Sequence, residues 1–187
     1  EEVPNGYGPE ADLGTNLALR APAVTDVSCA ADGPVDKIND GVIPSSKWCG
    51  LSTNGSAYLD LGKEVDISRW VVYHANCRGA GEGVSYNTVD FELLYAGDDG
   101  AEVLDPTDEK AAERVKNLEY KEADTVKGNK QNITDRNLNE PIKARYIKLH
   151  VTKSDNTAWS AIRIYELQLY ENAGEGSVAV SPSPLER

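Results

Sequence analysis

The sequence predicts an all-β domain, either a β-sandwich or a closed barrel. Short stretches of alternating apolar and polar residues recur along the chain. One example is residues 145–151, in which Ile147, Leu149 and Val151 share one face. Turn residues such as Asp98-Asp99-Gly100 separate these stretches, and only one stretch has a helical pattern.

Each predicted element rests on a local pattern and on the turn residue that ends it. Residues 108–118 follow Pro106 and are predicted to form a helix that offers Val115 and Leu118 to the core; no function is assigned to it. Trp48 and Trp70 lie beside strand patterns and are predicted core residues. The predicted strands are 57–61, which ends at Gly62, then 67–74, 88–96, 145–151 and 162–170.

The 187 residues fit one domain with short flanking segments. Residues 1–15 and 172–187 are rich in Gly and Pro and have no periodicity, so we expect a linker and a tail around a module at 16–171. This organisation suggests a module cut from a longer polypeptide. The chain opens with Glu1 and not Met, so we expect a mature or excised segment, and the missing signal peptide says nothing about secretion.

The net charge argues against two classes of partner. Asp and Glu outnumber Lys and Arg by 31 to 19, a formal net charge of -12. This charge repels phosphate backbones and anionic lipids, so neither nucleic acid nor membrane lipid is an expected partner. No stretch approaches the about 20 apolar residues of a membrane span.

Cys29, Cys49 and Cys77 do not form a zinc pattern. One disulfide with a spare buried thiol and three reduced core cysteines are both compatible with the sequence. We favour a Cys29–Cys49 bridge as the working expectation.

An independent enzyme is not expected. The chain has two histidines, and it contains no nucleophile elbow, metalloprotease, P-loop or dinucleotide motif. The glycine-rich stretch 79–83 has no lysine and no following helix, so it is not a phosphate loop.

A first candidate site combines "KINDGVIPSSKW" at 37–48 with "RIYELQLYE" near the end of the chain. Asp40-Gly41 followed by serines offers carboxylate, carbonyl and hydroxyl oxygens, the hard ligands that suit Ca²⁺. Glu166 interrupts the face that Ile162 and Ile164 define, so its carboxylate needs a partner. The alternative is an ordinary Asp-Gly turn with a glutamate at a sheet edge, and the spacing alone favours that alternative.

A second candidate site combines the glycine-punctuated loop after residue 73 with "SDNTAWSA" at 154–161. Sugar sites pair planar hydrogen-bonding side chains with an aromatic face. Trp159 is an aromatic residue in a polar loop, so it is either a lid on the end of the domain or a platform for a ligand. The first loop carries four hydrogen-bonding side chains: His74, Arg78, Glu82 and Asn87.

Motifs in a fixed order, from Asn16 to Glu171, resemble a discoidin or coagulation factor 5/8 type C domain. Within the galactose-binding-like superfamily, the chain is most similar to family 32 carbohydrate-binding modules of secreted bacterial glycoside hydrolases. The matching stretches are "NLALRAPA", "KINDG…SSKW", "AYLDLGKEVDISRWVVYHA", "YNTVDFELLYAGDDG", "VKGNKQNIT", "ARYIKLHVTK" and "AIRIYELQLYE".

The resemblance implies an eight-stranded jelly-roll β-sandwich with one short helix in a connection, and a structural Ca²⁺ without a catalytic role. Two departures affect the ligands: Ser45 could replace Ser46 because the spacing is one residue longer than usual, and Val42 stands where Asn or Asp is common. By position, the metal residues would be Asp40, Ser46 and Glu166 through side chains (Ser46 also through its carbonyl), with Lys37, Val42 and Tyr165 through backbone carbonyls.

The resemblance also implies a shallow sugar site formed by His74, Arg78, Glu82, Asn87 and Trp159. The alternative for the polar residues is a loop braced internally by a His74–Glu82 or an Arg78–Glu82 pair. The expected function is non-catalytic: the module would tether the catalytic domain of a secreted polypeptide to glycans that end in galactose, N-acetylgalactosamine or N-acetylglucosamine. It would act outside the cell as a monomer. A discoidin-type adhesion domain for a protein partner is the alternative.

Overall fold

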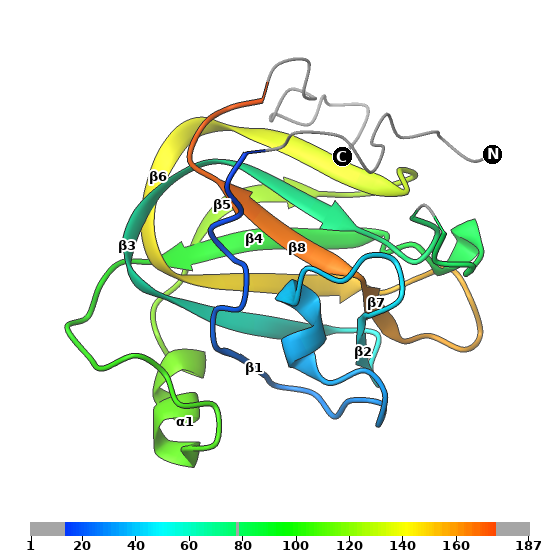
Figure 1. Ribbon diagram of the computed structural model, residues 1–187. Helices are drawn as coiled ribbons and strands as arrows, with labels where there is room; N and C mark the ends of the chain where they lie inside the picture. Colours follow the sequence, from blue (N-terminus) through cyan, green and yellow to red (C-terminus); the bar gives the residue numbers. More distant parts are fainter. Residues whose placement is uncertain (1–13, 78, 175–187) are drawn as a thin grey trace.

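The structure is a computed structural model that describes residues 14–77 and 79–174, and it confirms the predicted all-β sandwich (Figure 1). Most of the predicted linker and tail therefore lie outside the described residues. No helix in the described part has the length and apolar character needed to cross a bilayer. The elements in chain order are β1 (Ala23–Thr25), η1 (Val35–Asn39), β2 (Trp48–Gly50), β3 (Gly55–Tyr73), η2 (Val84–Tyr86), β4 (Asp90–Ala96), α1 (Glu109–Lys116), β5 (Lys121–Val126), β6 (Ile133–Lys153), β7 (Ile162–Ile164) and β8 (Glu166–Tyr170).

Two long strands, β3 and β6, run through both layers of the sandwich. In one layer the order is β1-β3-β6-β4-β5. The later half of β3 pairs with the early half of β6 and with β8, which builds the second layer. Figure 1 shows both strands curving around one side of the domain, while β2 and β7 form a separate pair.

The main core lies between these layers. Trp70 packs edge-on against Phe91, with the ring centroids 5.7 Å apart and the planes at 77°. Trp48 and Trp70 are both fully buried, as the sequence predicts. Burial of such large aromatic side chains stabilises a fold by about 2–3 kcal/mol each.

The predicted strands 57–61 and 67–74 form one strand, because Gly62 makes a bulge rather than an end. Its φ of +81° lies in the left-handed region, and the register between β3 and β6 shifts between Asp60 and Val65. The predicted strand 162–170 is divided at Tyr165, since β7 pairs with β2 and β8 pairs with β3. The three-residue strands β1 and β2 are too short to show an alternating pattern.

Helix α1 confirms the predicted helix but covers the outer face of the sheet. Asp108 is its N-cap and accepts hydrogen bonds from the N–H groups of Lys110 and Ala111. Val115 is fully buried in a small cluster with Tyr58 and Tyr146, separate from the main core.

The expected Cys29–Cys49 disulfide is wrong, because all three cysteines carry free thiols. Cys29 lies opposite Gly50 in an isolated antiparallel bridge, so the neighbouring Cys49 side chain points to the other face. Burial raises the pKa of the thiols of Cys49 and Cys77, the latter to about 12.

The first and last described segments are joined. The N–H of Leu17 donates to the carbonyl of Leu169 at 2.8 Å. The side-chain oxygen of Asn16 accepts a hydrogen bond from the N–H of Leu169 at 3.1 Å.

Candidate functional site

The predicted calcium loop follows η1 directly. Asp40 caps this short helix, and Gly41 has a φ of +76°, a conformation that favours glycine. One carboxylate oxygen of Asp40 accepts a hydrogen bond from the N–H of Val42 at 3.0 Å, and the other accepts one from the Ser46 hydroxyl at 2.6 Å. Ser46, and not the exposed Ser45, therefore contacts Asp40.

Glu166, at the start of β8, lies against the same loop and is fully buried. Its Oε2 accepts a hydrogen bond from the N–H of Gly41 at 2.9 Å. Its Oε1 is buried and has no hydrogen-bond partner among the described residues. Burial raises the pKa of Glu166 to about 8; the Gly41 hydrogen bond opposes this rise and the charge of Asp40 adds to it.

Glu166 Oε1 is buried without a hydrogen-bond partner among the described residues. For this reason the residues at this site fit a Ca²⁺ ion. A buried carboxylate that lacks a partner is stabilised by a cation. No group of three or more His, Cys, Asp or Glu forms a metal site within residues 14–77 and 79–174. The further ligands would therefore be neutral oxygens, from Ser46 and from the carbonyls of Lys37, Val42 and Tyr165.

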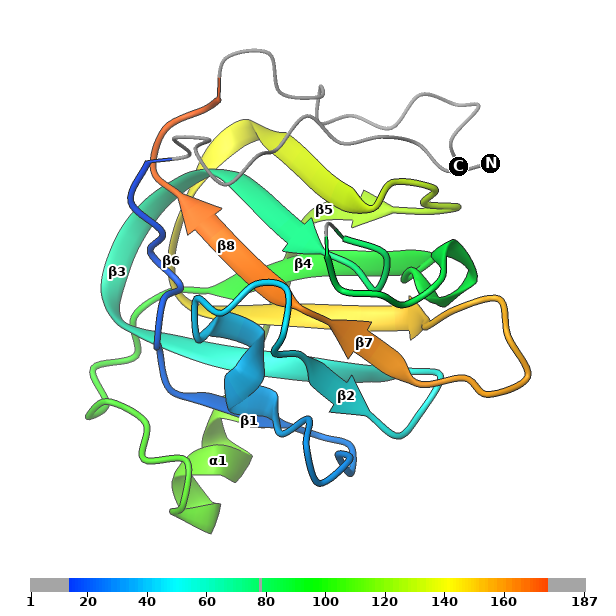
Figure 2. The same ribbon diagram turned by 45° about the vertical axis from the view of Figure 1, so that its right-hand side comes forward.

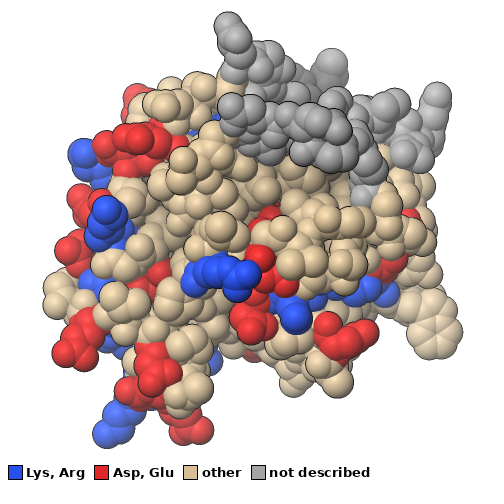
Figure 3. All heavy atoms as spheres, in the orientation of Figure 1, with Lys and Arg blue, Asp and Glu red and all other residues tan. Residues whose placement is uncertain are grey.

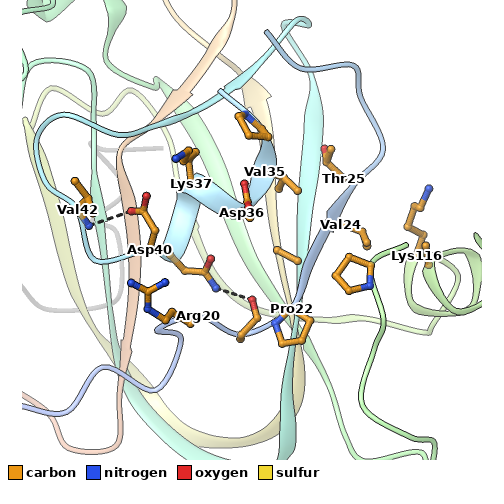
Figure 4. Close-up of a pocket in the computed structure, with 16 residues that line it drawn as sticks. Arg20, Pro22, Val24, Thr25, Val35, Asp36, Lys37, Asp40, Val42 and Lys116 are labelled. Atoms are coloured by element: carbon orange, nitrogen blue, oxygen red, sulfur yellow. Dashed lines mark hydrogen bonds between the residues drawn. The ribbon is translucent and has the colours of Figure 1, made fainter. Parts of the chain in front are cut away.

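A hollow of about 900 Å³ lies beside this loop. Figure 4 shows Asp40 and Val42 on one side of it and Lys116, from α1, on the other. Residues of β1 lie between them, with Arg20 close by. None of the predicted sugar-binding residues that the structure describes lines this hollow, which separates it from the predicted glycan site.

The structure corrects the roles predicted for His74 and Asn87, because both are buried. The Nε2 of His74 lies 2.7 Å from the Thr134 hydroxyl, and burial lowers the pKa of His74 to about 3. Asn87 accepts a hydrogen bond from the N–H of Asn76 at 2.8 Å and donates one to the side chain of Asn132 at 3.0 Å. Both residues therefore brace the loops from within and do not reach a ligand directly.

The carboxylate of Glu82 is bonded to other side chains of the protein. Its Oε1 accepts hydrogen bonds from the Lys47 ammonium and the Tyr165 hydroxyl. Its Oε2 pairs with the Nε of Arg163 at 2.9 Å. This agrees with the alternative of an internally braced loop, although the partners are not those that the sequence suggests. Arg78, the remaining predicted residue of this loop, lies outside the described residues.

Trp159 is the most exposed large apolar residue in the described part of the chain, with 79% of its surface accessible. Its loop is held by the buried Asp155, which accepts hydrogen bonds from Thr157, Ser160 and Arg163. Burial alone would raise the pKa of Asp155, but the hydrogen bonds from Thr157, Ala161 and Ser160 hold it below its ordinary value. The indole is thus presented on a fixed turn.

The loops carrying Glu82 and Trp159 lie side by side. The N–H of Asn156 donates to the carbonyl of Ser85 at 3.2 Å, and the Arg163 guanidinium lies 4.4 Å from the centre of the Tyr86 ring. Figures 1 and 2 both show η2 and the connection from β6 to β7 at the same end of the sandwich. The sequence did not identify Lys47, Asp155 and Arg163 as residues that hold these loops. The only sign of their role in the sequence is that each is a charged residue close to a candidate site.

The described surface carries charges of both signs (Figure 3). On the face that Figure 3 shows, acidic and basic side chains are interspersed, and no continuous basic band crosses it.

Comparison with known proteins defines the class of domain. The family model of the F5/8 type C domain matches residues 23–167, so the chain belongs to this family. No curated protein sequence matches the chain. The galactose-binding-like jelly roll that the motifs implied is the fold that the matched solved structures share.

Among solved structures, the family 32 carbohydrate-binding module of Streptococcus pneumoniae EndoD is 32% identical, and its alignment covers 84% of this chain and 100% of that one with a TM-score of 0.65. At this identity the chain is a carbohydrate-binding module of family 32. The fold is also shared by CpGH89CBM32-5 of Clostridium perfringens, at 15% identity and a TM-score of 0.61 over 83% and 99% of the two chains. Chitosan-binding module 2 of Paenibacillus sp. IK-5 is 19% identical, with a TM-score of 0.60 over 83% and 99%.

Proposed function

We propose that this module is non-catalytic and holds a larger secreted glycoside hydrolase on glycans that end in galactose, N-acetylgalactosamine or N-acetylglucosamine. The observation that carries this proposal is Trp159, an indole with 79% of its surface accessible, on a turn fixed by buried hydrogen bonds at the loop end of the sandwich. An exposed, rigid aromatic face suits the apolar side of a sugar ring.

The solved neighbours support this choice of sugars. CpGH89CBM32-5 is in complex with GalNAc-β-1,3-galactose, and chitosan-binding module 2 is in complex with chitotriose. A single shallow site binds weakly, so the benefit to the parent enzyme would come from a raised effective concentration at a glycan surface. Such a tether acts outside the cell, and a monomer is sufficient for it.

We further propose that Ca²⁺ binds between the Asp40 loop and Glu166 and holds the two segments together. The ion would neutralise the buried Glu166 carboxylate, whose Oε1 has no other partner in the part of the chain described. It would stabilise the loops and take no part in a reaction.

The experiment that tests the glycan proposal is a glycan array with the purified chain and with Trp159→Ala. Binding to one family of terminal sugars that Trp159→Ala abolishes, with folding unchanged, would support the module and its site. Val103→Ala is the matched control, since Val103 is also a well-exposed apolar residue, with 56% of its surface accessible, but belongs to the loop before α1. Retention of binding in Trp159→Ala would remove this site.

One observation favours the alternative, a protein partner. Leu51 and Val84 are exposed apolar residues with 58% and 41% of their surfaces accessible. Leu51 follows β2, whose partner β7 lies just after the Trp159 loop. An array without any binding, together with an intact fold and bound Ca²⁺, would favour this adhesion function.

A further inference from the structure

The candidate calcium loop and the loop at 79–86 meet at one carboxylate, that of Glu82. Two of its donors are immediate neighbours of candidate calcium ligands: Lys47 follows Ser46, and Tyr165 precedes Glu166. Both donate to Glu82 Oε1. The position of each donor is therefore set by a segment that the ion would fix.

The surroundings of Glu82 make this junction stiff. Its side chain is only 20% accessible, and the Nε of Arg163 contacts the second oxygen at 2.9 Å. The Lys47 ammonium also lies 5.6 Å from the centre of the Tyr165 ring. A partly buried carboxylate with three donors has few alternative positions.

Direct packing joins the same two loops. A Cβ atom added at Gly79 would lie 3.0 Å from Cγ of Pro44, so the ring of Pro44 packs closely against the backbone of Gly79. Ile43 and Ala80 pack against one apolar cluster, which contains Cys77 and Tyr165. Movement of the calcium loop would therefore disturb the 79–86 loop through both polar and apolar contacts.

We propose that Glu82 is a positioning residue, not a sugar ligand, and that it transmits calcium occupancy to the glycan-binding loops. Calcium bound at Asp40 and Glu166 fixes Lys47 and Tyr165, and these hold Glu82 and the 79–86 loop. That loop supports the Trp159 loop through the Asn156–Ser85 hydrogen bond. This inference rests on the proposed calcium and glycan sites.

The proposed coupling between calcium and glycan binding is reciprocal. A ligand that orders a loop lowers the entropic cost of a second ligand that needs the same order. The calcium dependence of glycan affinity must then equal the glycan dependence of calcium affinity. We expect a factor of about 5 or more, the lower end of common couplings.

The first test is amide hydrogen exchange of residues 79–86 with and without Ca²⁺, which needs no sugar. Calcium is expected to slow exchange there in the parent chain, relative to the distant turn at 98–101. Glu82→Gln, which keeps the shape but loses the charge, is expected to bind Ca²⁺ within about 3-fold of the parent and to lose the slowing. Glu140→Gln is the matched control, because Glu140 is an exposed glutamate within β6 and belongs to neither loop.

Lys47→Met provides a second variant should Glu82→Gln fail to fold, with the exposed Lys63→Met as its control. Equal slowing of exchange in Glu82→Gln and the parent, no slowing in the parent, or no calcium binding would each overturn the proposal.

The second test measures the affinity for galactose, N-acetylgalactosamine and N-acetylglucosamine by calorimetry with and without Ca²⁺. If calcium slows exchange but no sugar binds, the coupling between the loops stands and the proposed glycan-binding function is rejected. If a sugar binds with the same affinity with and without Ca²⁺, the glycan-binding function stands and the coupling is rejected.

Discussion

The Glu166 carboxylate accepts a hydrogen bond from the backbone N–H of Gly41 at 2.9 Å, across a sequence separation of 125 residues. This contact joins the last strand of the second layer to the loop after η1. It leaves the other oxygen of Glu166 buried, without a partner among the residues described. The relationship turns two unremarkable sequence features, an Asp-Gly turn and a glutamate in a strand, into one candidate cation site.

Glu166→Gln is expected to abolish stabilisation by calcium. A saturating concentration, about 100-fold above Kd, stabilises a folded protein by about 2.7 kcal/mol, which corresponds to about 5–10 °C in Tm for a domain of this size. The parent should show this rise on addition of Ca²⁺ and lose it with EDTA. Glu140→Gln should behave as the parent does. An unchanged calcium response in Glu166→Gln, measured by thermal unfolding, would remove Glu166 from the site.

Trp159→Ala is expected to weaken glycan binding at least about 10-fold, because the stacking face is lost. Trp159→Phe should keep part of the affinity, since an aromatic ring remains. Both should leave Tm within about 2 °C of the parent, because 79% of the indole surface is already accessible. Calorimetry with the sugar identified on the array measures the affinities, and a parallel loss of stability would indicate a lid instead of a platform.

His74 makes the module sensitive to mild acid. Its folded pKa, lowered to about 3 from an ordinary 6.5, means that the unfolded chain takes up a proton below pH 6.5 while the folded chain does not. Stability is therefore lost as the pH falls from about 6.5 toward 3, by about 2 kcal/mol between pH 6.5 and 5. Urea unfolding at several pH values should show this slope reduced in His74→Gln. An equal slope in His74→Gln and in the parent would contradict this account.

Asp60 and Arg145 form a buried ion pair at 3.0 Å between β3 and β6, and the two side chains are 0% and 3% accessible. Asp60→Asn should destabilise the domain by about 3–5 kcal/mol, because it removes the buried charge partner of Arg145 and leaves only the more exposed Asp98 and Asp99. Lys143→Ala breaks an exposed pair with Asp66 at 2.7 Å and should cost at most about 1 kcal/mol. Equal effects in denaturant unfolding would contradict this account.

The sequence predicted the fold class because alternation and turn residues are local signals. It placed the strand around Leu59 and the helix around Val115 correctly. It did not predict that residues 57–61 and 67–74 form one strand, since Gly62 is equally compatible with a bulge and with an end. The pairing of Tyr58 with both Val24 and Lys148 depends on contacts that no window of sequence contains.

The candidate site was only partly predictable. The loop after Asp40 and Glu166 lie together through the Gly41–Glu166 hydrogen bond, and Trp159 is exposed. Their roles as calcium ligands and as a sugar platform stay predictions. His74 and Asn87 look like ligands in the sequence because a polar side chain in a loop gives no sign of its direction. The structure turns both inward, where the Nε2 of His74 lies next to the Thr134 hydroxyl and Asn87 donates to Asn132.

The contact between the first and last described segments of the module bears on how the module can be joined to other domains. Asn16 and Leu17 are bonded to Leu169, and β8 runs from Glu166, opposite Tyr73 at the loop end, away from that end. The first and last described segments of the module therefore lie side by side. A domain whose ends lie together is portable, because it can be inserted into a surface loop of another protein without separating the two sides of that loop.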